Sequence, residues 1–143
     1  MKFQSKHWLV LGGFFSFMIS ILHIAIIFGG APAYRYFRAG EKMAQMALSG
    51  SVLPALLTFF IAAIFAIWGL YALSGAGVIR TLPLVRLGLF VIASIYTLRG
   101  IVFIPQIINI FNMAKPVLSQ DIIFSVAALI VGIVHWIGIF TRK

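Results

Sequence analysis

The chain contains no cysteine, and this absence removes several kinds of chemistry. Without thiols the protein forms no disulfide, ligates no iron–sulfur cluster and carries out no thiolate catalysis. Acidic residues are nearly absent as well, because Glu41 and Asp121 are the only two in 143 residues. A site built from paired carboxylates, or a cluster of acids around a metal ion, is therefore not expected.

Charge of either sign is scarce, and apolar residues take its place. Charged residues make up 9% of the chain and hydrophobic residues 63%, whereas soluble domains carry about a quarter charged residues. Four apolar stretches reach the roughly 20 helical residues that cross a hydrocarbon layer about 30 Å thick. They are residues 8–30, 52–74, 84–106 and 122–140. The sequence therefore predicts an all-α polytopic membrane protein, a bundle of four transmembrane helices forming one domain over residues 1–143.

The net charge of +9 does not indicate nucleic-acid binding, because the basic residues flank the apolar stretches. Four spans place both termini on one side, so the lysines and arginines can be divided between the two faces. The terminal side has Lys2, Lys6, Arg80, Arg86, Arg142 and Lys143; the other side has Arg35, Arg38, Lys42 and Lys115. The positive-inside rule then predicts a multi-pass protein of the inner (plasma) membrane with both termini in the cytoplasm.

The N-terminal stretch has a second interpretation, a secretory signal. Lys2, Lys6, an apolar run and the A-x-A-like segment 31–33 imitate such a signal. The run is longer than the roughly 7 to 15 residues of a signal core. We therefore expect it to be retained as the first span.

Residues 31–50 form the one long connection between spans. Its first half gathers the aromatic and basic residues Tyr34, Arg35, Tyr36, Phe37 and Arg38. Residues 41–48 have helical composition with an apolar face. We expect a short interfacial helix in this first extracytoplasmic loop, lying at the membrane surface or folding over the bundle as a lid. The alternative is a loop that is only anchored among the lipid headgroups by its aromatic and basic side chains.

Arg99 stands inside the third apolar stretch, and its permanent charge makes it the most informative residue of the chain. A guanidinium in the bilayer core costs at least about 2.5 to 3.5 kcal/mol. Polar partners must therefore hold it. We expect Arg99 to pair with Asp121 or with Glu41, the two acids of the chain.

Depth along the helices brings further polar groups to the level of Arg99. With a rise of about 1.5 Å per residue, each span places one polar group at a similar level in the outer half of the membrane. These groups are His23, Thr58, Arg99 and Ser125. In the third span Tyr96, Arg99, Phe103 and Gln106 also share one helical face, which we expect to look inward. Pro105 removes a backbone hydrogen bond, so that helix should kink or end near it.

This layer predicts an outward-facing intramembrane polar pocket, covered by residues 31–50. Such a pocket suits a membrane lipid, a quinone or another amphipathic or anionic small molecule. The residues assigned to it are Arg99, His23, Tyr96, Thr58, Ser125, Gln106, Tyr34, Arg35 and Arg38. The structural alternative is a polar clasp that fixes the register of the helices.

No motif in the chain names a reaction or a cofactor. The three histidines, His7, His23 and His135, fall at different depths, so neither a metal site nor haem is expected. We expect His135, next to Trp136, to be an interfacial histidine that bonds a backbone carbonyl. A membrane-embedded enzyme that uses His23 and Arg99 stays an alternative, as does a small transporter or channel subunit.

Small residues recur at four-residue spacing in three of the spans, a pattern typical of close helix packing. They are Gly12, Ser16 and Ser20, then Ala62 and Ala66, and finally Ala128 and Gly132. Through such seams the protein would also be able to dock as an accessory subunit of a membrane complex or to form a homo-oligomer.

Overall fold

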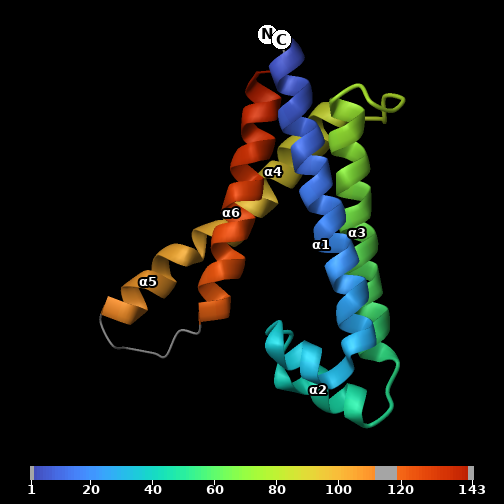
Figure 1. Ribbon diagram of the computed structural model, residues 1–143, viewed down its shortest axis with the longest axis vertical. Helices are drawn as coiled ribbons and strands as arrows, with labels where there is room; N and C mark the ends of the chain where they lie inside the picture. Colours follow the sequence, from blue (N-terminus) through green and yellow to red (C-terminus); the bar gives the residue numbers. More distant parts are fainter. Residues whose placement is uncertain (1, 112–118, 142–143) are drawn as a thin grey trace. The chain divides into compact units, whose positions relative to one another are not determined.

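The computed structural model describes residues 2–111 and 119–141, and over these residues the chain is helical with no strand. The helices are α1 (Lys2–Tyr36), α2 (Glu41–Leu48), α3 (Leu53–Gly75), α4 (Val85–Ile101), α5 (Phe103–Phe111) and α6 (Ser119–Phe140) (Figure 1). The predicted all-α class is thus confirmed. Lys115, Arg142 and Lys143, which entered the charge count above, lie outside the described residues.

Four helical stretches are long and apolar enough to cross a membrane. They run over Lys6–Tyr36, Leu53–Gly75, Val85–Ile108 and Ser119–Phe140. Large apolar side chains on them are exposed, among them Phe28 at 87%, Phe60 at 64% and Leu98 at 66%. A long helix that is apolar on all sides is typical of a membrane span, since lipid covers the faces that the protein does not. By length and composition, the chain is a multi-pass membrane protein with four candidate spans.

The described residues group into two compact units. Unit 1 comprises residues 1–13 and 70–143, which contain the start of α1, the end of α3, and α4 to α6. Unit 2 comprises residues 14–69, which contain the rest of α1, all of α2 and most of α3. Whether residues 1–143 act as one domain stays a prediction.

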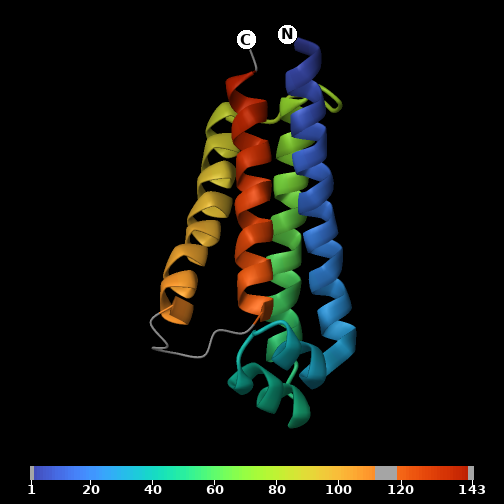
Figure 2. The same ribbon diagram turned by 60° about the vertical axis from the view of Figure 1, so that its left-hand side comes forward.

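In unit 1, α4 and α6 run side by side (Figure 1, Figure 2). The two helices approach closely because both carry glycine at their contact. A Cβ atom built at Gly100 would lie 2.6 Å from the Cα atom of Leu129, and one built at Gly132 would lie 2.9 Å from the Thr97 nitrogen. The seam that the sequence predicts at Gly132 is therefore a real contact within the chain.

The two ends of the chain also meet in unit 1. Leu9, near the N-terminus, is fully buried, and a Cβ atom built at Gly138, near the C-terminus, would lie 2.7 Å from its side chain. Leu9 packs in one apolar cluster with Ala72, Val85 and Leu89. Both termini thus lie at one end of the unit, as an even number of spans requires.

In unit 2, α1 bends at Gly30. This residue has φ 58° and ψ −145°, a conformation that is essentially limited to glycine. Pro32 follows in the first turn after the bend, where its missing N–H is not needed. The first span was predicted to end at residue 30, whereas in the structure the helix resumes beyond the bend and runs to Tyr36.

The short helix predicted between the first two spans is confirmed as α2, with the predicted bounds. Its Ala44 is fully buried in a cluster with Ile26, Ala31 and Tyr34 from α1. The apolar face of α2 is thus used to hold the helix against the end of α1. Its place at a membrane interface stays a prediction.

The third predicted span, residues 84–106, is interrupted. Helix α4 ends at Ile101 and α5 begins at Phe103, so the break precedes Pro105 by one turn. Pro105 lies in the first turn of α5, where a proline removes no helical hydrogen bond. The predicted kink near Pro105 is confirmed, and a single helix over the whole span is not found.

Candidate functional site

Arg99 and Ser125 form a hydrogen bond across the α4–α6 contact of unit 1. The Arg99 guanidinium Nη1 donates to the Ser125 hydroxyl at 3.1 Å. Ser125 is fully buried and donates its own proton to the Asp121 carbonyl of α6, at 2.8 Å. The lone pairs of its hydroxyl are therefore left to receive the guanidinium. One of the five N–H groups of Arg99 is fixed by this bond, while the Arg99 side chain itself is exposed.

The predicted face of the third span is only partly turned inward. Tyr96 is buried, and its ring stacks on that of His135 with centroids 5.5 Å apart. Arg99, one turn further on, is exposed, and Gln106 on α5 is partly buried. The side chain of Phe103 lies outside the described part of the structure.

His135 is held in one tautomer inside unit 1. Its Nδ1 lies 2.8 Å from the Val131 carbonyl, and because a carbonyl only accepts, Nδ1 carries the proton. The predicted bond of His135 to a backbone carbonyl is thereby confirmed. The ring is fully buried against Gly12, where an added Cβ atom would lie 2.8 Å from it. Among the described residues, its Nε2 has no hydrogen-bond partner.

A second hydroxyl bridges α4 and α6, and the sequence reasoning missed it. Trp136 Nε1 donates to Thr97 Oγ1 at 3.0 Å, and that hydroxyl donates to the Ala93 carbonyl at 2.8 Å. At Ser125 a donor on α4 meets a hydroxyl on α6, whereas at Thr97 a donor on α6 meets a hydroxyl on α4. Ala93 and Thr97 have the same four-residue spacing as the small residues of the other spans, and this spacing was the available signal.

In unit 2, buried Thr58 and Tyr34 lie together. Thr58 Oγ1 donates to the Pro54 carbonyl at 2.8 Å. The hydroxyl oxygen of Tyr34 lies 3.5 Å from Thr58 Oγ1. Both side chains are assigned to the predicted pocket, and both lie beside the end of α1 that holds α2.

His23, also in unit 2, repeats the bonding of His135. Its Nδ1 donates to the Ile19 carbonyl at 2.8 Å, and its ring contacts Phe65 with centroids 5.2 Å apart. Unlike His135, His23 is partly exposed.

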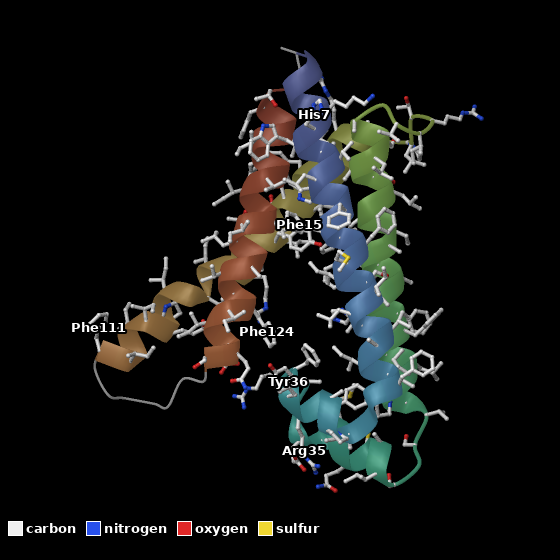
Figure 3. All side chains as sticks on the ribbon, in the orientation of Figure 1. His7, Phe15, Arg35, Tyr36, Phe111 and Phe124 are labelled. Carbon is white, nitrogen blue, oxygen red and sulfur yellow. The ribbon has the colours of Figure 1, made fainter. Side chains whose placement is uncertain are left out.

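Arg35 and Glu41 form a bidentate ion pair where α1 ends and α2 begins; Arg35 is labelled in Figure 3. Arg35 Nε and Nη2 donate to the two carboxylate oxygens at 2.9 and 2.7 Å, and Gln45 donates to the same carboxylate at 2.6 Å. These bonds, that of Arg35 first, hold the pKa of Glu41 at about 2, below its ordinary 4.5. Glu41, one of the two acids considered for Arg99, is thus bound by Arg35.

The structure brings the predicted site residues together in separate groups. Unit 1 joins Arg99 to Ser125, and unit 2 joins Tyr34 to Thr58 and Arg35 to Glu41. A single pocket that combines the groups, and the pairing of Arg99 with Asp121, stay predictions. Within residues 2–111 and 119–141, no three histidine or acidic side chains gather as a metal site would require.

Comparison of the chain with protein-family models, with curated proteins and with solved structures found no match. The protein class and the candidate site are therefore assigned from the sequence and structure of this chain alone. The chain is a multi-pass membrane protein, by the length and composition of its helices, with an arginine inside the third candidate span.

Proposed function

We propose that the protein binds an anionic amphipathic molecule within the membrane, with the anionic group at Arg99. The observation that carries this proposal is the bond from the exposed Arg99 side chain to buried Ser125 inside an apolar span. Intramembrane ionisable residues commonly mark the sites where membrane proteins bind ligands.

The chemistry of the Arg99–Ser125 pair suits an anion. The hydroxyl orients the guanidinium but carries no charge, and charge–charge attraction is much stronger in apolar surroundings than in water. A phosphate or carboxylate accepts two parallel N–H bonds from a guanidinium. An apolar tail on the same molecule would lie along the exposed apolar side chains of α4, such as Leu98 at 66%.

The packing of the small residues supports a ligand-binding function over that of an accessory subunit. Gly12 is covered by His135, Gly100 by Leu129 and Gly132 by Thr97, all within unit 1. The surfaces of these three glycines are thus already covered by residues of the same chain and are not accessible to a helix of a partner protein.

Native mass spectrometry with phosphatidylglycerol tests the function. The purified protein is titrated with palmitoyl-oleoyl phosphatidylglycerol and, for comparison, with phosphatidylcholine of the same acyl chains. Arg99→Ala should weaken phosphatidylglycerol binding about ten-fold, the effect of losing one charge-assisted interaction. Arg86→Ala is the matched control, because Arg86 is an exposed arginine in the first turn of the same helix.

Two outcomes contradict the proposal. Equal phosphatidylglycerol binding by the wild type and Arg99→Ala would remove Arg99 from the site. Displacement of the lipid by millimolar inorganic phosphate would show a site for the free anion, with no part for the apolar tail.

We further propose that both termini lie in the cytoplasm and that residues 31–50 lie outside. The support is the distribution of lysine and arginine. Because the chain has no cysteine, Lys42→Cys and Arg80→Cys provide single labelling sites. An impermeant maleimide should label intact cells at position 42 and not at position 80; the reverse pattern would invert the topology.

A further inference from the structure

Gln106 presents a buried acceptor that the described residues do not satisfy. Its Oε1 is shielded from solvent and receives no hydrogen bond from them, although the side chain as a whole is only partly buried. Helix α5, which carries Gln106, packs against α6. A buried carboxamide oxygen normally accepts a hydrogen bond, so the unpaired Oε1 of Gln106 calls for a partner.

Gln106 lies further along the third span than Arg99. The two residues are about two helical turns apart, and the span ends at Ile108, just beyond Gln106. Polar groups along this span therefore run from a cation, deeper in the span, to an amide near its end. A phospholipid presents its polar groups in the matching order, since the phosphate lies deeper than the rest of the headgroup.

We propose that the carboxamide oxygen of Gln106 accepts a hydrogen bond from the lipid headgroup and thereby selects headgroups that carry an N–H or O–H donor beyond the phosphate. The proposal rests on the function proposed above, in which Arg99 binds the anionic group. The Gln106 side chain as a whole is only partly buried, and a change of its side-chain torsions would bring Oε1 to a headgroup donor.

The chemistry of the acceptor separates lipids that otherwise differ little. Ethanolamine and glycerol headgroups carry N–H or O–H donors, and choline carries neither. Phosphatidylethanolamine and phosphatidylcholine have the same net charge, so a preference between them reports on the hydrogen bond and not on the charge at Arg99. The ethanolamine lipid should bind about five-fold more tightly, the usual effect of one hydrogen bond.

The test is native mass spectrometry of the full chain with palmitoyl-oleoyl phosphatidylethanolamine and phosphatidylcholine. Gln106→Leu, which has no acceptor, should reduce the five-fold preference to less than two-fold. Gln45→Leu is the matched control and should keep the preference, because Gln45 is an exposed glutamine whose amide donates to Glu41. If Gln106→Leu does not fold, Gln106→Met keeps the length of the side chain without the acceptor.

The outcomes separate this inference from the proposed function. A wild-type protein that binds both lipids equally, or a Gln106→Leu variant that keeps the preference, overturns the role of Gln106 and leaves Arg99 untouched. A loss of preference in Gln106→Leu alone supports it. Unchanged phosphatidylglycerol binding in Arg99→Ala instead contradicts the proposed function itself.

Discussion

The two units each hold an arginine in a different way. In unit 2, Arg35 meets a carboxylate with two N–H groups, and both side chains are well exposed, at 45% and 60%. In unit 1, Arg99 meets a neutral hydroxyl with one N–H group, inside a candidate span. Arg35–Glu41 has the better hydrogen-bond geometry, yet we expect it to contribute less to stability than Arg99–Ser125. Water screens the exposed charges of Arg35 and Glu41, whereas an apolar environment strengthens a polar contact.

The units also differ in how their helices pack. In unit 1, Gly100 lets α4 approach the backbone of α6 at Leu129. In unit 2, Gly69 faces the ring of Phe17, and a Cβ atom there would lie 2.7 Å from the edge of that ring. A side chain can rotate away from an added methyl group, whereas a helix backbone cannot, so the contact at Gly100 should tolerate less change than the contact at Gly69.

The largest expected effect tests this difference in packing. Gly100→Ala should destabilise the protein by about 3 kcal/mol, the upper part of the usual range for overpacking, while Gly69→Ala should cost about 1 kcal/mol or less. Thermal unfolding in detergent, followed by circular dichroism, measures both. Equal losses for the two variants would show that the α4–α6 backbone contact is no tighter than the contact with the Phe17 ring.

A smaller effect is expected from the hydroxyl that holds Arg99. Ser125→Ala should cost about 2 kcal/mol, because it removes a hydrogen bond to a charged group. Ser20→Ala, which removes the bond to the Ala62 carbonyl in unit 2, should cost about 0.6 kcal/mol, the average for neutral bonds between membrane helices. The same unfolding measurement compares them.

Lipid binding by Ser125→Ala adds a second readout to that comparison. If Ser125 orients Arg99 for a ligand, phosphatidylglycerol binding should weaken together with stability. A loss of stability with unchanged lipid binding would assign the Arg99–Ser125 bond to a structural clasp alone.

The smallest expected effect concerns pH and the exposed pair. Folding lowers the pKa of Glu41 from 4.5 to about 2, so its stabilising effect is present above pH 4.5 and is lost as the pH falls through the folded value of about 2. At pH 6 the amides of α2 should exchange hydrogen about two-fold more slowly in the wild type than in Glu41→Gln, and the two proteins should exchange equally at about pH 1, below the folded pKa. The comparison is made at equal pH, so the intrinsic exchange rates cancel. A difference that persists at about pH 1 would exclude the Glu41 charge as its cause.

Much of the fold could be predicted from the chain because membrane spans and turn residues are local signals. The second and fourth spans were predicted as 52–74 and 122–140, and the structure has Leu53–Gly75 and Ser119–Phe140. The short helix was predicted with its observed bounds. The break in the third span came slightly earlier than Pro105, because a proline fits well within the first turn of a new helix.

The contacts of the candidate site were less predictable. Depth along the helices put Ser125 at the level of Arg99, and the two do form a hydrogen bond. Depth gives no information on the direction in which a side chain points, so it did not assign Glu41 to Arg35. The bridge from Trp136 to Thr97 was missed for the same reason, although both residues stand in predicted spans.

The sequence by itself determined that the protein is a set of long apolar helices with the permanent charge of Arg99 inside the third, because composition and length alone decide which segments suit a membrane. Only the tertiary structure decided that Arg99 meets Ser125, that Gly12 makes room for His135, and that Gln106 keeps a covered acceptor. These depend on the rotation of each helix about its axis, which is set by side-chain packing between segments far apart in the chain.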